Sequence, residues 1–147
     1  MAMSNKHETI YVVADSRYRD VSQYPNANHF AFDFDSPFKN VISIELVYAL
    51  YDKGVGNETY VHMLIPELCN FLLSNNTTTS GAFTQLPLNK ATNEYTSNKF
   101  KSIKVFTPPL SKLGRLTMSL VSGDGKPYPI DDYLVRFEIV CINNKLD

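Results

Sequence analysis

Apolar and polar side chains alternate along most of this chain with the period of two that is typical of β-strands. The alternation is clearest in His29–Asp35, where one face carries Phe30, Phe32 and Phe34. Val41–Asp52 alternates in its first half and is apolar on both faces in its second half. Strands are predicted over Thr9–Asp15, His29–Asp35, Val41–Asp52, Tyr60–Ile65, Ala82–Leu88, Phe100–Thr107, Arg115–Leu120 and Tyr133–Ile142.

Turn-forming and polar residues separate these strands. Ser74–Gly81 and Asn89–Asn98 are predicted to be polar loops, and Ser36–Asn40 and Leu110–Gly114 are predicted to interrupt the strands on either side of them. Only Ile65–Leu73 has helical spacing, with Pro66 at its first position, so it is predicted to be a short helix.

The segments together predict an all-β fold with a single domain. We expect a flexible N-terminal arm over residues 1–8 and a jelly-roll-like β-sandwich over residues 9–147, with one short helix near 65–73. The chain has 147 residues, of which 44% are hydrophobic, and this length suits one domain with its own core.

Composition excludes several classes of protein. The 14 Lys and Arg residues nearly balance the 15 Asp and Glu residues, so a basic surface for nucleic acid is not expected. No apolar run is long enough for a transmembrane segment, and the first residues do not resemble a secretion signal. Two cysteines, Cys69 and Cys141, are too few for a disulfide scaffold and are predicted to be buried thiols.

Few residues suggest catalysis or metal binding. His7, His29 and His62 fall in different predicted segments, and no acid, base and nucleophile cluster in the sequence. Asp33 with Asp35, and Asp131 with Asp132, can either bind Ca²⁺ through their oxygens or simply face water. The sequence therefore predicts no cofactor, no metal site and no enzymatic activity.

The segment Asp15–Asp20 reads D-S-R-Y-R-D and directly follows the first predicted strand. It can be a solvated turn in which Arg and Asp pair locally. It can also be an interface, since Arg and Tyr are enriched at the contact points that dominate binding. The candidate interface residues are Asp15, Arg17, Tyr18, Arg19, Asp20 and Arg115.

Two longer stretches have a distinctive order of motifs. Val13–Leu46 contains V-A-D-S-R-Y-R-D, then Y-P-N, N-H-F-A-F-D-F and K-N-V-I-S-I-E-L. Thr107–Asp124 contains P-P-L-S-K-L-G-R-L-T-M, followed after a strand by D-G. Together they resemble segments of structural proteins of large nucleocytoplasmic DNA viruses, which often have Asp where this chain has Gly114. The resemblance implies a minor capsid protein with a jelly-roll-like β-sandwich and no catalytic residues.

The expected function is therefore that of a minor capsid protein that binds neighbouring capsid proteins and stabilises the shell. Its partners would be the major capsid protein, other minor capsid proteins or a second copy of itself. Its location would be the virion, assembled in the cytoplasm of the host cell. The alternative is a non-catalytic ligand-binding β-sandwich module for carbohydrates. An enzyme is the least supported of the three.

Overall fold

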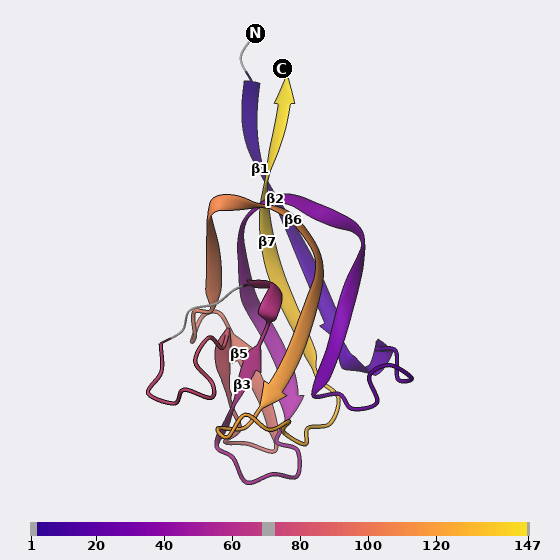
Figure 1. The fold of residues 1–147 in the computed structure, drawn as a ribbon, viewed down its shortest axis with the longest axis vertical. Helices are drawn as coiled ribbons and strands as arrows, with labels where there is room; N and C mark the ends of the chain where they lie inside the picture. Colours follow the sequence, from indigo (N-terminus) through magenta and orange to yellow (C-terminus); the bar gives the residue numbers. More distant parts are fainter. Residues whose placement is uncertain (1–2, 69–72, 147) are drawn as a thin grey trace.

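The computed structural model describes residues 3–68 and 73–146 and confirms the all-β prediction (Figure 1). No helix in these two ranges is long and apolar enough to cross a membrane. The strands of the described chain are β1 (Met3–Asp15), β2 (His29–Asp52), β3 (Tyr60–Leu64), β4 (Thr84–Pro87), β5 (Thr92–Thr96), β6 (Ile103–Val121) and β7 (Leu134–Leu146). The two 3₁₀ turns are η1 (Ser16–Tyr18) and η2 (Pro66–Leu68).

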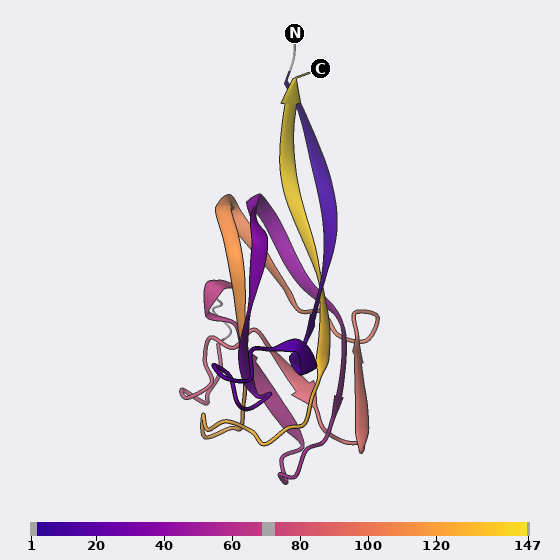
Figure 2. The same cartoon turned by 90° about the vertical axis from the view of Figure 1, so that its right-hand side faces the viewer.

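These strands form one antiparallel sheet in the order β1-β7-β2-β6-β3-β4, with β5 paired to β2. The first part of β2 pairs with the last part of β6, whereas the second part of β2 pairs with β7 and β5. The sheet therefore curls, and Figure 2 shows its two halves facing each other. The β-sandwich and jelly-roll arrangement stays a prediction, because the strands belong to one connected sheet.

The curl explains why two predicted interruptions are absent. Ser36–Asn40 lies inside β2 and Leu110–Gly114 lies inside β6, so each of these strands joins two predicted ones. The register between β2 and β6 shifts twice in this region, and Asn40 has a positive φ of 54°. Such irregularities bend a strand without ending it, and Asn tolerates the left-handed conformation well.

The core lies between the two halves of the curled sheet. The inward side chains of β2, β6 and β7 that are fully buried include Ile44, Leu46, Ala49, Leu116, Met118, Leu120, Val135, Phe137 and Ile139. The predicted phenylalanine face of β2 is only partly in this core. Phe30 is 2% exposed, but Phe32 and Phe34 are half-buried, with ring centroids 5.2 Å apart. The difference arises because this part of β2 has a neighbouring strand on one side only, β6.

The N-terminal segment differs from the predicted flexible arm over residues 1–8. Strand β1 begins at Met3, and residues 3–8 pair with residues 141–146 of β7. This part of β1 and β7 projects from the body as a two-stranded ribbon, with Met3 paired to Leu146 at its tip (Figures 1 and 2). The sequence pattern missed it because the pairing partner is distant in the chain and residues 6–9 are exposed, which removes the alternation.

Two further segments differ from their predictions. The predicted loop Asn89–Asn98 contains β5, where Asn93 and Tyr95 are buried while Glu94 is exposed. Its alternation was hidden because one of the inward residues is polar. The described part of the predicted helix Ile65–Leu73 is the single 3₁₀ turn η2, which Glu67 fixes by accepting hydrogen bonds from Thr117 of β6. Residues 69–72 of the predicted helix, including Cys69, lie outside the described residues.

Candidate functional interface

The D-S-R-Y-R-D segment forms the turn that follows β1. Asp15 caps η1 by accepting a hydrogen bond from the backbone N–H of Arg17, and its carboxylate also lies 2.7 Å from the Arg17 guanidinium. The hydrogen bond from this guanidinium lowers the pKa of Asp15 below its usual value. Tyr18 is 83% exposed, and the Arg17 guanidinium lies 5.7 Å from the centre of its ring. Arg17 and Tyr18 therefore form an exposed cationic and aromatic pair at the surface.

Arg19 and Asp20 instead hold the following loop together. The Arg19 side chain is only 12% exposed, and it donates hydrogen bonds to the backbone carbonyls of Tyr24, Ser16 and Pro25 at 2.8 to 3.0 Å. It also lies 3.1 Å from the Asp132 carboxylate. Asp20 accepts hydrogen bonds from Ser22, which lower its pKa. Their polar groups are therefore engaged within the molecule.

Arg115 lies on β6, away from the turn after β1. Its guanidinium donates two hydrogen bonds to the carboxylate of Asp33 on the paired strand β2, at 2.6 and 3.2 Å. Both side chains are exposed, so the pair is a surface ion pair of small energetic weight. The hydrogen bond from Arg115 lowers the pKa of Asp33.

A more extensive candidate surface is the outward face of four adjacent strands, which we name the open face. Strand registers place its residues on one side of the sheet, and it carries five exposed apolar side chains, of which Tyr11 is 60% and Val105 56% exposed. Near the middle of this face, the Arg136 guanidinium lies 5.6 Å from the centre of the Tyr48 ring. The open face consists of Tyr11, Val13, Ser43, Glu45, Tyr48, Leu50, Ile103, Val105, Leu134, Arg136, Glu138 and Val140.

The open face continues into the turn after β1. A hollow of about 340 Å³ is lined by Arg17 of that turn together with Leu50 and Leu134 of the open face. From strand spacings, the open face alone covers about 400 Å². A standard interface takes about 800 Å² from each partner. A partner of ordinary size would therefore cover both the open face and the exposed Arg17–Tyr18 pair.

The acidic residues that the sequence offered as metal ligands include two that form ion pairs with arginines. Asp33 pairs with Arg115 and Asp132 with Arg19, and no group of three or more His, Cys, Asp or Glu side chains in the described ranges is placed to hold a metal. Burial lowers the pKa of His62. Cys141 is a buried free thiol, as predicted, and burial raises its pKa.

Sequence reasoning missed the open face, although part of its signal was present. In β1, Tyr11 and Val13 alternate with the buried Val12 and Ala14, so both faces of the strand are apolar. Such a strand is usually interpreted as buried on both sides. Which side remains uncovered depends on the curl of the sheet, and that curl comes from the bends in β2 and β6.

Comparisons with known proteins give a family but no function. No curated protein matches this chain. Residues 1–100 match a family of unknown function, DUF5901, and this match includes β1, β2 and the turn between them. The chain therefore belongs to the family of unknown function DUF5901.

Proposed function

We propose that this protein is a minor capsid protein of a large DNA virus, which binds neighbouring capsid proteins and stabilises the shell. The observation that supports the proposal best is the open face, where apolar side chains remain exposed on a rigid sheet. Exposed apolar side chains gathered on one face of a folded protein often mark a binding site. The motifs that resemble viral structural proteins supply the kind of partner.

The chemistry of the open face suits contact with a folded protein. Aromatic residues and Arg are enriched in protein interfaces, and the open face combines Tyr11 and Tyr48 with Arg136. Its side chains stand on paired strands, so little backbone order has to be gained on binding. Glu45 and Glu138 lie opposite each other in the register, and Lys101 pairs with Glu45 at 3.3 Å. A partner with a complementary basic group beside Glu138 would add specificity.

The proposed partners are the major capsid protein, other minor capsid proteins or a second copy of this chain. Direct contact with nucleic acid is not proposed, because the net charge of −1 does not favour phosphate binding. The proposed location is the virion. The function requires binding and no turnover of a substrate.

The first test is quantitative mass spectrometry of purified particles compared with infected-cell lysate. We expect this protein to be enriched in particles at a fixed ratio to the main shell protein. Absence from the particles would overturn the proposal.

A second test asks whether the open face is the contact. Replacing Tyr11 and Leu50 together by Ser should leave folding intact and reduce incorporation into particles by at least about tenfold, which corresponds to about 1.4 kcal/mol. Val55→Ser is the matched control, because Val55 is 83% exposed but lies in the loop between β2 and β3. Equal incorporation of the double variant and the control would remove the open face as the contact.

A further inference from the structure

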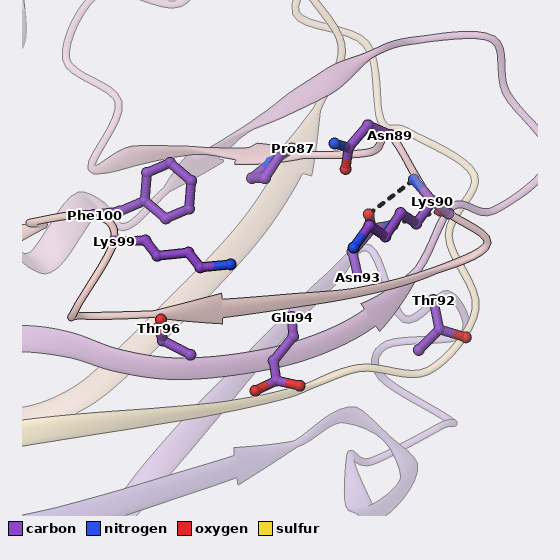
Figure 3. A pocket seen from close by; sticks show the side chains of 9 residues that line it. All are labelled: Pro87, Asn89, Lys90, Thr92, Asn93, Glu94, Thr96, Lys99 and Phe100. Atoms are coloured by element: carbon purple, nitrogen blue, oxygen red, sulfur yellow. Dashed lines mark hydrogen bonds between the residues drawn. The ribbon is translucent and has the colours of Figure 1, made fainter.

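A second site lies between β4 and β5, outside the open face. It is a cleft of about 380 Å³ whose lining includes Lys90, Lys99, Phe100 and Pro87 (Figure 3). We propose that this cleft binds an acidic sugar, meaning a sugar ring that carries a carboxylate or a sulfate. The proposal goes beyond the proposed function and does not depend on it.

Two lysines, one before and one after β5, line this cleft. Figure 3 shows both side chains on the same side of the strand and directed toward each other, whereas the carboxylate of Glu94, which also belongs to the lining, lies on the other side. No salt bridge within the described ranges involves Lys90 or Lys99. Two ammonium groups without a carboxylate partner form a suitable place for an oxyanion.

The backbone beneath each lysine is fixed. The side chain of Asn93 accepts a hydrogen bond from the Lys90 N–H at 3.1 Å and donates one to the Lys90 carbonyl at 2.8 Å (Figure 3). Lys99 donates its N–H to the carbonyl of Thr96 at 3.2 Å, in the turn that ends β5. Because both lysines start from hydrogen-bonded turns, only their side chains have to be ordered by a ligand.

Phe100 supplies a flat apolar wall beside the lysines. Its ring stacks on Tyr95, with centroids 5.3 Å apart and an angle of 23° between the planes, and Phe100 remains 43% exposed. Tyr95 is fully buried, and its hydroxyl donates to Ser102, which donates in turn to Thr84. The buried hydrogen-bond chain holds Tyr95, so one face of Phe100 is supported and the other is available.

The shape and polarity of the cleft favour a sugar over other anions. The C–H face of a sugar ring can rest on one aromatic ring, and the pyrrolidine ring of Pro87 extends this apolar wall. Exposed Asn89 in the lining, on the same side as the lysines (Figure 3), can bond a hydroxyl group. A nucleotide base would gain more from a slot between two flat walls, and a bare anion would make no use of Phe100.

The test is a titration of the full chain with sodium glucuronate as the probe. Binding is monitored through the ¹⁵N chemical shifts of the backbone amides. Glucose is the matched neutral sugar, sodium sulfate the anion without a ring, and adenosine monophosphate the anionic ligand with an aromatic base. We expect saturable shifts around Lys90, Lys99 and Phe100 with glucuronate, and binding at least about tenfold weaker with glucose and with sulfate.

Variants distinguish specific binding in this cleft from nonspecific attraction of anions to surface lysines. Lys99→Gln should weaken glucuronate binding about five- to tenfold through loss of a charged hydrogen bond, and Phe100→Ala should weaken it to a similar degree. Lys112→Gln, at an exposed lysine on β6, should leave it unchanged. Absence of saturation would overturn the proposal, as would equal binding of sulfate and glucuronate or tighter binding of adenosine monophosphate. Particle incorporation is measured separately, so failure here leaves the proposed capsid role untouched.

Discussion

The turn after β1 and the open face lie side by side but use their side chains in opposite ways. The turn is rich in charge, and Arg19 and Asp20 direct their polar groups to the loop itself and to Asp132. The open face is rich in apolar and aromatic groups, and five of its apolar side chains are between 41% and 60% exposed. The charged residues of the sequence therefore pointed to the D-S-R-Y-R-D turn, which largely stabilises itself. The exposed apolar surface of the open face could be recognised only from the fold.

The largest effect should separate the two faces of the sheet, compared on the paired strands β7 and β1. Phe137→Ala removes a fully buried ring from β7 and should lower the free energy of unfolding by about 3–5 kcal/mol. Val13→Ala, on the open face of the neighbouring strand, should change it by less than about 0.5 kcal/mol. Urea denaturation measures both values. A similar loss in the two variants would mean that the open face is covered.

The next effect concerns the two arginines of the turn. Arg19→Ala removes the side-chain donor to the carbonyls of Tyr24 and Pro25, while the Ser16 carbonyl keeps the backbone N–H of residue 19, and should destabilise the fold by about 1–3 kcal/mol. Arg19→Lys should restore little, because a single ammonium cannot reproduce the planar fork of a guanidinium.

Arg17→Ala is the matched control for this comparison. Arg17 is mostly exposed, and its interactions are with its near neighbours Asp15 and Tyr18, so its removal should change thermal stability little. If instead Arg17→Ala were the more destabilising variant in thermal denaturation, the exposed Arg17–Asp15 pair would stabilise the turn more than the hydrogen bonds of Arg19 do.

The third prediction compares the loss of stability at two phenylalanines of β2, Phe30 and Phe32. Phe32→Ala should cost about 1–2 kcal/mol, because the ring is half-buried and about half of the apolar transfer energy is lost. Phe30→Ala, at a buried position, should cost about 3–5 kcal/mol. Denaturation of the two variants under the same conditions gives the comparison. Equal losses would place the first part of β2 deeper in the core than the structure does.

The all-β class followed from the sequence because alternation is a local property. Strands around Phe30, Leu46 and Phe137 were predicted from their own residues, and the inward positions of β7 were assigned to the correct face. Strand β5 was missed because Asn93 occupies an inward position, where its amide is satisfied by the backbone of Lys90. That compensation is a tertiary feature and leaves no periodic trace.

Pairing between distant segments could not be predicted in the same way. Residues 3–8 have no apolar face, and their strand exists through pairing with the other end of the chain. The bends in β2 and β6 depend on register shifts between two strands, which a single strand does not encode. The open face and the cleft beside Phe100 both depend on this geometry, so neither could be predicted from a motif.

The smallest effect tests the exposed part of the turn. The hydrogen bond from Arg17 lowers the pKa of Asp15, so the folded state binds this proton less tightly than the unfolded chain does. The resulting stabilisation is present above the ordinary pKa of Asp and is lost as the pH falls through the folded value. It should be small and weaken with salt, because the pair is exposed.

Arg17→Ala should therefore raise the pKa of Asp15 toward its ordinary value, as measured by a ¹³C carboxyl titration. The pKa of Asp20 is the internal control, because its lowering comes from hydrogen bonds donated by Ser22 and Gln23 and should persist in the variant. If Asp15 kept its low pKa without Arg17, the cap on η1 would be sufficient to hold the carboxylate. The Arg17 guanidinium would then already be available to a partner. Within the turn, only Arg19 and Asp20 would still differ from the open face by directing their polar groups to the protein itself.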